Sequence, residues 1–412
     1  MGDGVLLRIL FVHKHCPGQF VHLAAALAAD PANEVVFVAE QIDATIPGVR
    51  IETCKPLRRS EPPTHHYLQS FENAVLLGQA AYRAFTSLSR SGFAPDLAYA
   101  HAGFGPGLYV KDAFPRTPLI GHFEWYYRAC NSDADFLSTA DITEDEALRI
   151  RTKNAGILME LTQCDRGICP TRFQRDQFPP EFLAKLSVVH EGVDTGYFLP
   201  AADRPASLDG LPPDVMGGEI VTYAARGLEP YRGFPQFMKA FAIVQTRRPR
   251  AHAVVLGDDN VYYGGPHPNG QAWRTAMLEA LPEIDSSRIH FLGRVGLDRY
   301  RDVLRASRVH VYLTVPFVLS WSLVEAMSTG CTIIGSNTAP VLELLENGRT
   351  GLIVDFHDPE AIAAAIERAL DDDGLAATLG ANARRFAVET FDLKHILPRQ
   401  LAIISSLVTH VL

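Results

Sequence analysis

Short apolar runs alternate along the chain with longer segments in which apolar residues recur every three or four positions. Apolar runs of four to eight residues predict strands, and the longer recurrence predicts amphipathic helices. Regular alternation of the two predicts parallel sheets covered by helices. The predicted strands are 6–12, 34–38, 97–101, 119–122, 166–169, 186–190, 220–224, 253–256, 289–292, 309–313 and 332–335. The predicted helices are 21–29, 71–90, 147–164, 172–176, 234–247, 273–281, 297–306 and 323–328.

The alternation occurs twice and restarts after a stretch rich in proline and glycine. A chain of 412 residues also exceeds what one ordinary core holds. We therefore predict an α/β protein with two Rossmann-like, doubly wound domains that face an interdomain cleft. Their predicted ranges are 1–195 and 219–385, with a linker at 196–218 and a C-terminal helix at 386–412. Ligands of such sheets bind at the carboxyl ends of strands, so candidate residues are sought there.

Composition narrows the classes of partner. Hydrophobic residues make up 47% of the chain and charged residues 21%, which is typical of a globular protein. The net charge of −9 argues against nucleic acid as the main partner. The six cysteines form no CxxC pair, so reduced thiols and a cytoplasmic location are expected rather than a zinc site. A basic stretch between Arg50 and His66 is either a solvated loop or a contact for anionic lipid, so any membrane contact is expected to be peripheral.

The second half carries the strongest chemical signals. Arg226 and Arg232 lie between a predicted strand and a helix, flanked by glycines. Fixed cations there can stabilise negative charge that develops on a leaving group. Glu325 lies in the helix after the strand 309–313, where a carboxylate is well placed to bind the two hydroxyls of a ribose. The loop before it offers free backbone N–H groups at a helix N-terminus.

The first half carries weaker signals at its own strand ends. Gly18 precedes a helix and permits a close approach of the backbone to a phosphate or sugar. His122 ends a strand and is followed by Glu124 and Trp125, an acid and an aromatic ring suited to a sugar. His101 ends the preceding strand and is expected on the same wall. Asp133 and Asp135 spell a DxD pattern, which we discount as a metal site because it lies in a polar loop.

The segment from Pro316 to Met327 resembles the nucleotide-sugar site of family 4 glycosyltransferases. The family pattern there is Glu, seven residues, Glu, then Ala-Met or Ala-Leu. Glu325 matches the second acid, whereas Phe317 stands in the place of the first. Two further segments are similar to family motifs: 190–198 to Asn-Gly-Val-Asp-x-x-x-Phe, and 224–234 to Gly-Arg-Leu-x-x-x-Lys-Gly.

The resemblance implies a GT-B fold and a retaining transfer of a sugar from a nucleoside-diphosphate-sugar to a hydroxyl acceptor. It also implies no metal, no cofactor beyond this donor, and a last helix that crosses back onto the first domain. The acceptor is expected to be a glycan, a lipid-linked glycan or a small metabolite, bound in the first domain near Glu124, Trp125 and His101. Arg226, Arg232 and His122 are the expected catalytic residues.

The donor is expected to contact the following residues: Glu325, Ser320, Trp321, Leu319, Val295, Gly18 and Phe317. Among these, Glu325 would hold the ribose, and the backbone around Ser320 would meet the sugar or phosphate. Phe317 leaves alternatives open. An apolar ring there suits a deoxysugar donor, or it marks a non-catalytic nucleotide-sugar binder. A nucleotide-sugar epimerase of the same fold is a further alternative.

Overall fold

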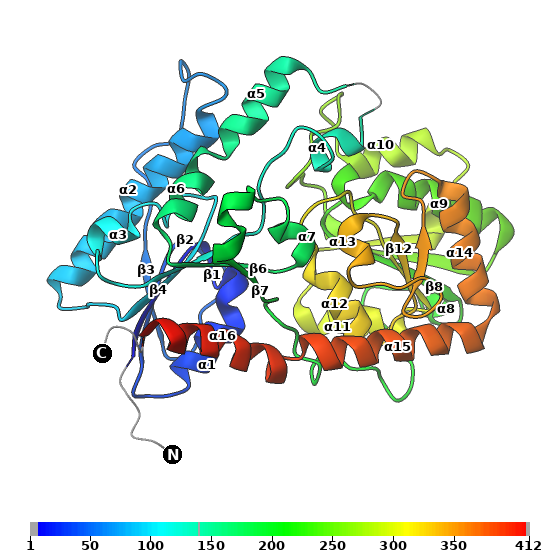
Figure 1. The fold of residues 1–412 in the computed structure, drawn as a ribbon. Helices are drawn as coiled ribbons and strands as arrows, with labels where there is room; N and C mark the ends of the chain where they lie inside the picture. The colour runs from blue at the N-terminus through cyan, green and yellow to red at the C-terminus, as the bar shows by residue number, and fades with distance from the viewer. Residues whose placement is uncertain (1–6, 139–140, 409–412) are drawn as a thin grey trace. The chain divides into compact units, whose positions relative to one another are not determined.

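The structure is a computed structural model that describes residues 7–138 and 141–408. The chain forms two units, one containing Met1–Gly192 and Leu393–Leu412 and the other Val193–Asp392. Each unit is built on one sheet of parallel strands with helices on both faces (Figure 1). The doubly wound α/β architecture predicted from the alternating pattern is therefore present in both units.

The first unit contains a seven-stranded sheet of order β3-β2-β1-β4-β5-β6-β7. Its strands are β1 (Arg8–Cys16), β2 (Glu34–Ile42), β3 (Val49–Thr53), β4 (Leu97–His101), β5 (Leu119–His122), β6 (Arg166–Cys169) and β7 (Leu186–Val188). Its helices are α1 (Val21–Ala28), α2 (Gln69–Arg90), α3 (Val110–Ala113), α4 (Asp133–Phe136), α5 (Glu144–Lys153), α6 (Ala155–Gln163), α7 (Arg172–Arg175) and α16 (Leu393–Val408). The strand order reverses between β1 and β4, and ligands of doubly wound sheets bind at such a switch point.

Both faces of this sheet are covered by apolar helix faces, because parallel strands are buried on both sides. On one face, Leu77 and Phe85 of α2 and Ile157 of α6 pack in one core with Leu10 of β1. On the other face, residues of α1 and α16 pack with Phe11, as in the contact between α1 and α16 seen in Figure 1. The C-terminal helix α16 therefore completes the core of the first unit.

The second unit contains a six-stranded sheet of order β10-β9-β8-β11-β12-β13, with its switch point between β8 and β11. Its strands are β8 (Glu219–Gly227), β9 (Ala251–Asp258), β10 (Ile289–Gly293), β11 (Val309–Tyr312), β12 (Ile333–Ser336) and β13 (Leu352–Val354). Its helices are α8 (Pro213–Met216), α9 (Phe234–Arg247), α10 (Trp273–Ala280), α11 (Leu297–Ala306), α12 (Trp321–Ser328), α13 (Ala339–Leu342), α14 (Pro359–Asp371) and α15 (Asp373–Phe391). Helix α12 and helix α15 share one core with β12.

The division of the chain differs from the predicted one in two places. The stretch 196–218 was predicted as a linker, but it belongs to the second unit, where Phe198, Leu208 and Val215 are buried. The second crossing lies at Asp392 and Leu393, later than the predicted start at 386, because Phe391 is still buried in the second unit. Residue 6 of the first predicted strand and the last four residues of the predicted C-terminal helix lie outside the described part.

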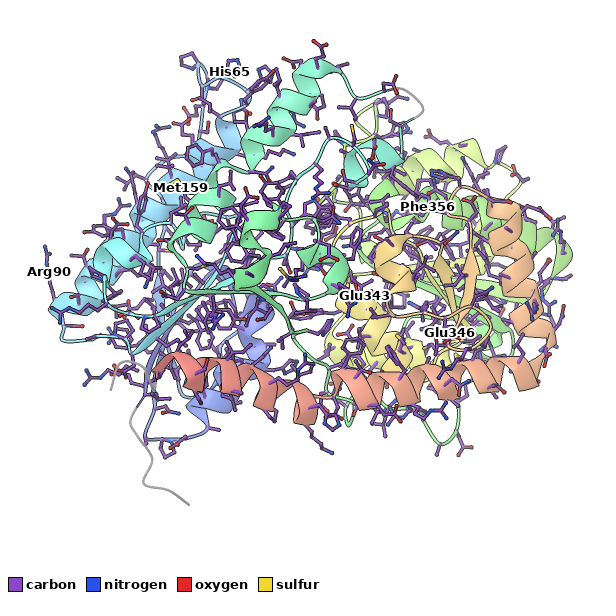
Figure 2. All side chains as sticks on the ribbon, viewed as in Figure 1. His65, Arg90, Met159, Glu343, Glu346 and Phe356 are labelled. Atoms are coloured by element: carbon purple, nitrogen blue, oxygen red, sulfur yellow. The ribbon has the colours of Figure 1, made fainter. Side chains whose placement is uncertain are left out.

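The basic stretch before α2 carries fewer free charges than its sequence suggests. Arg58 pairs with Glu72 at 2.6 Å, and Arg59 pairs with the buried Glu40. Figure 2 marks His65 in the loop before α2. Two arginines of the stretch are therefore paired with acids, and the two predicted roles of the stretch, a solvated loop or a contact for anionic lipid, stay predictions. None of the described helices is both long and apolar enough to cross a membrane.

Candidate functional site

Arg226 lies near the carboxyl end of β8, at the switch point of the second sheet. Its guanidinium carbon lies 4.3 Å from the centroid of the Tyr262 ring, a cation–π distance that holds the side chain in place. The side chain is exposed and makes no ion pair with any residue in the described ranges 7–138 and 141–408. An exposed, unpaired and oriented arginine is available to bind an anion.

Arg232, in contrast to Arg226, is buried. It is the last residue of the short 3-10 helix Pro230–Arg232. One terminal nitrogen, Nη1, donates hydrogen bonds to Thr314 Oγ1 and to the carbonyl oxygen of Val318, each at 2.9 Å. The guanidinium also lies 4.9 Å from the Tyr263 ring centroid. Arg232 therefore holds the loop between β11 and α12 in place. Its predicted contact with the donor diphosphate stays a prediction.

Two tyrosines that the sequence reasoning missed come from the loop after β9. This loop is anchored by Glu229, which is 0% exposed and accepts three backbone N–H groups, from Tyr262 at 3.1 Å, Tyr263 at 3.2 Å and Gly264 at 2.7 Å. The Tyr262 hydroxyl also donates to Asp258 Oδ2 at 2.6 Å. The anchored loop places one aromatic ring against each arginine. The sequence feature that could have indicated these residues is a pair of tyrosines followed by two glycines, shortly after a predicted strand.

Phe317 is 8% exposed and packs in an aromatic cluster. Its ring centroid lies 5.5 Å from that of Tyr231 and 5.3 Å from that of Tyr263. The Arg232 guanidinium carbon lies 5.8 Å from the same ring. In this chain the position of the usual family acid is therefore an apolar wall beside a buried arginine.

Glu325 lies in the second turn of α12, as its distance from the strand predicted. Burial raises the pKa of Glu325 to about 7, and only the neighbouring Tyr300 hydroxyl acts in the opposite direction. A carboxyl group that titrates near neutral pH is poised to change charge when a ligand donates hydrogen bonds to it.

Some hydrogen-bonding groups of the loop before α12 already have partners within the second unit. Ser320 caps the helix, with its hydroxyl oxygen accepting from the N–H of Ser322 at 3.3 Å. The Ser320 N–H, which was expected to meet the sugar, donates to the Tyr312 hydroxyl at 2.9 Å. Leu319 is buried in the core, whereas Trp321 and Val295 are half-buried. The expected backbone contact at Ser320 therefore requires displacing a bond within the unit.

Three histidines form a row across the switch point of the first sheet. Val12 of β1 pairs with Ala100 of β4, and His101 pairs with His122 of β5, so His13 stands level with His101 and His122, the last residues of β4 and β5. The ring centroids of His13 and His101 are 4.4 Å apart, and those of His101 and His122 are 5.2 Å apart. Each of these histidines is at most 3% exposed.

Two carboxylates face this row. Glu124 Oε2 lies 3.4 Å from His101 Nε2, and Glu191 Oε1 lies 3.0 Å from His122 Nε2. Burial alone would raise the pKa of Glu191, but the contact with His122 and the charge of His190 outweigh it and lower the pKa to about 2. Burial also acts to raise the pKa of Glu124, but the contact with His101 outweighs it, so the pKa is lowered. Both acids are therefore ionised at neutral pH.

Gly18 and Trp125 have structural roles in this unit. Gly18 has a φ of +49°, and a Cβ there would lie 2.8 Å from the His13 ring, so only glycine leaves room for the histidine row. Trp125 is buried, with its ring centroid 5.8 Å from that of Phe173. The expectation that Trp125 stacks on an acceptor sugar therefore does not fit its place in the core. Glu124, with 23% of its side chain exposed, stays accessible.

The DxD pattern lies at the start of the short helix α4 rather than in a polar loop, and Asp135 has a local structural role. Its carboxylate accepts from the N–H groups of Asn131 at 2.7 Å and Ser132 at 3.0 Å, which forms a capping box at the start of α4. The predicted absence of a metal at the DxD pattern stays a prediction.

Comparison with known proteins follows the same division into two units. The family described as "Glycosyl transferase family 4 group" matches residues 31–198, and "Glycosyl transferases group 1" matches residues 214–386. The chain belongs to the family 4 glycosyltransferases. It is 27% identical to a D-inositol 3-phosphate glycosyltransferase of Streptomyces avermitilis, over 72% of this chain and 65% of that protein, so the match spans less than two thirds of the relative's length.

Solved structures place this family 4 glycosyltransferase among GT-B folds. Sucrose-phosphate synthase from Thermosynechococcus elongatus superposes with a TM-score of 0.73 at 18% identity, covering 98% of this chain and 100% of that chain. Anabaena HepE in complex with UDP-glucose superposes with a TM-score of 0.68 at 17% identity, covering 97% of this chain and 100% of that chain. The predicted GT-B architecture is thus confirmed by relatives that share little sequence with this family member.

Proposed function

We propose that this chain is a retaining glycosyltransferase that moves a sugar from a nucleoside-diphosphate-sugar to a hydroxyl group of an acceptor. One observation carries the proposal. The switch point of the second sheet combines the exposed, unpaired Arg226 at the end of β8 with the titratable Glu325 on the helix after β11. The guanidinium of Arg226 suits the diphosphate of a nucleoside diphosphate, and the carboxyl group of Glu325 suits its ribose. The names of its relatives, D-inositol 3-phosphate glycosyltransferases, and the UDP-glucose bound to HepE support the same activity.

The proposed transfer needs charge stabilisation more than a protein nucleophile. The acceptor hydroxyl attacks the anomeric carbon on the face that the diphosphate leaves. The bond between that carbon and the phosphate oxygen breaks while the bond to the acceptor oxygen forms, and the leaving phosphate oxygen takes the acceptor proton. Arg226 offsets the negative charge that grows on the diphosphate. We propose that this arginine, rather than a metal ion, neutralises the leaving group, and that no cofactor besides the donor takes part in the transfer step.

The acceptor side belongs to the first unit in this proposal. Glu124 is the partly exposed member of the histidine and glutamate group at the strand ends, and it can accept a hydrogen bond from an acceptor hydroxyl. A glycan, a lipid-linked glycan or a small metabolite presents such hydroxyls. We also propose a cytoplasmic enzyme with at most peripheral membrane contact, because its six cysteines are free thiols.

A calorimetric panel of nucleoside diphosphates tests the donor site and identifies its base. We expect one of them to bind, and Glu325→Ala to weaken it by removing a charged hydrogen-bond acceptor that is worth about 1.5–3 kcal/mol. Glu283→Ala is the matched control, because Glu283 is an exposed glutamate of the same unit. Equal affinity in Glu325→Ala and the control would remove Glu325 from the site.

Donor affinity is expected to rise with pH through the titration of Glu325. Ribose hydroxyls donate to the carboxylate form, and a pKa of about 7 leaves most of this group protonated at lower pH. The ionised fraction grows about tenfold between pH 6 and pH 8, so the affinity should improve by up to about the same factor. A nucleoside-diphosphate-sugar is the right ligand, since its diphosphate does not titrate in this range. Glu325→Gln should make the profile flat; an unchanged slope would assign the effect to another group.

Phe317 supports a second candidate, a non-catalytic nucleotide-sugar binder. The residue fills the place of a family acid with a ring packed against Tyr231 and Tyr263. Such a protein would bind the nucleoside diphosphate tightly, yet show neither transfer nor donor hydrolysis with any donor. An epimerase would instead change the donor sugar without an acceptor. Product analysis of one donor series separates the three activities.

A further inference from the structure

The histidine row of the first unit contains a group of side chains that can bind a metal ion. His101, His122 and Glu124 each direct one ligand atom into a small volume, and these atoms all lie within 4.8 Å of one another. They come from the ends of β4 and β5 and from the residue two positions beyond β5, all in the first unit, whereas the proposed donor residues Arg226 and Glu325 belong to the second unit.

Each of the two buried imidazoles has one nitrogen without the partner that a buried polar group requires. Both histidines are 2% exposed, and their Nε2 atoms lie near the carboxylates of Glu124 and Glu191, but the Nδ1 atom of neither has a hydrogen-bond partner in the described part of the chain. Buried polar atoms are nearly always satisfied in folded proteins. The neighbouring carboxylates are close but leave this demand unmet, so a ligand that accepts nitrogen lone pairs fits the site.

We propose that His101, His122 and Glu124 bind one divalent transition-metal ion of the zinc type. Two imidazoles and one carboxylate are a recurring ligand set for zinc with a fourth position left open. Zinc binds such ligands at about 2.0–2.2 Å, which places two tetrahedral ligand atoms about 3.4 Å apart. His101 Nε2 and Glu124 Oε2 are already 3.4 Å apart. The three ligand atoms lie within 4.8 Å of one another, so bringing every pair to this separation takes side-chain movements of at most about 1.4 Å.

The surrounding residues orient these ligands as outer partners orient the ligands of known metal sites. Gln19 Nε2 donates to the second oxygen of Glu124, Oε1, at 2.6 Å and so fixes the carboxylate. Glu191 lies beside His122 and favours a polarised imidazole. His13 is excluded as a ligand through Nδ1, because that atom accepts the N–H of His15 at 2.7 Å.

Metal titration of the full chain, with any purification tag removed, tests this proposal. Stripped protein is titrated with Zn²⁺ alone by calorimetry, and the metal content is measured by mass spectrometry. We expect one Zn²⁺ per chain, with affinity reduced more than about 100-fold in His101→Ala or Glu124→Gln. Gln19→Ala should lose roughly 10–100-fold, as outer partners of metal ligands do.

The matched control is His290→Gln, which removes a half-buried histidine of the second unit that neighbours His252 and not the row. Its Zn²⁺ affinity should equal that of the wild type. Co²⁺ alone, added to the stripped wild-type chain, should give the visible absorption of a tetrahedral ion, which keeps the test valid if a variant misfolds. A folded wild-type chain that binds no Zn²⁺, or that binds it equally well in all variants, overturns the proposal.

The same samples keep this inference separate from the proposed function. Nucleoside diphosphate binding to the stripped chain reports the proposed donor site without any metal ion. A wild-type chain that binds a nucleoside diphosphate but no Zn²⁺ would refute the metal site alone. A chain that binds Zn²⁺ but no nucleoside diphosphate would refute the donor assignment alone.

Discussion

Replacement of Arg226 by alanine is expected to slow turnover of the donor by about 100- to 1000-fold. Removing one preoriented group that stabilises developing negative charge has an effect of this size in other enzymes. Arg226 is the exposed arginine at the switch point of the second sheet, and its stacking on Tyr262 at 4.3 Å fixes its direction in advance. The loss should therefore fall on the step in which the diphosphate departs, more than on the binding of the intact donor.

The measurement is release of nucleoside diphosphate from the donor, first without an acceptor and then with one. Arg226→Lys should keep part of the rate, because lysine retains the charge but loses the planar fork and its stacking. Arg294→Ala is the matched control. Arg294 is an exposed arginine just after β10, only loosely paired with Asp258 at 3.9 Å. Equal rates in Arg226→Ala and Arg294→Ala would show that Arg226 does not face the leaving group.

The predicted strands are largely present because parallel strands buried on both faces leave uninterrupted apolar runs in the sequence. Val49–Thr53 was missed since β3 lies at the sheet edge, where Arg50 and Glu52 break the apolar run. The edge strand β13 was missed for another reason: Leu352–Val354 is apolar, but a run of three residues is shorter than the four to eight that predict a strand.

Local and distant features of the candidate sites differ in how far sequence could predict them. The positions of Arg226 and Glu325 follow from one strand, one loop and one helix, so a short motif was sufficient. The anchoring of Tyr262 by Glu229 links residues 33 positions apart, and no local pattern shows it. The histidine row depends on the register of three strands that are distant in the sequence, and it became visible only once β1, β4 and β5 were paired.

Trp125 shows the limit of motif reasoning in the opposite direction. An aromatic residue directly after a strand is suited both to stacking on a sugar and to packing in the core. Burial against Phe173 decides for the core, and that contact spans 48 positions of the chain. The accessible residue of the same segment is the acid, Glu124.

Glu229→Ala is expected to destabilise the second unit by about 3 kcal/mol or more. The carboxylate is fully buried and accepts the N–H groups of Tyr262, Tyr263 and Gly264. Each buried donor left without a partner costs about 1–3 kcal/mol, and the small alanine side chain offers no replacement. Because the loop also positions the rings beside Arg226 and Arg232, donor affinity should fall together with stability.

Urea unfolding in a Trp125→Phe background measures this effect in the second unit, since the chain has three tryptophans and the remaining two, Trp273 and Trp321, both lie there. Glu229→Gln keeps one acceptor oxygen and should lose less stability than the alanine variant. Glu283→Ala, at an exposed position, should change the unfolding free energy by no more than about 0.5 kcal/mol. If Glu229→Ala unfolds at the same urea concentration as this control, the three hydrogen bonds do not hold the loop, and the aromatic contacts of the two arginines must have another source.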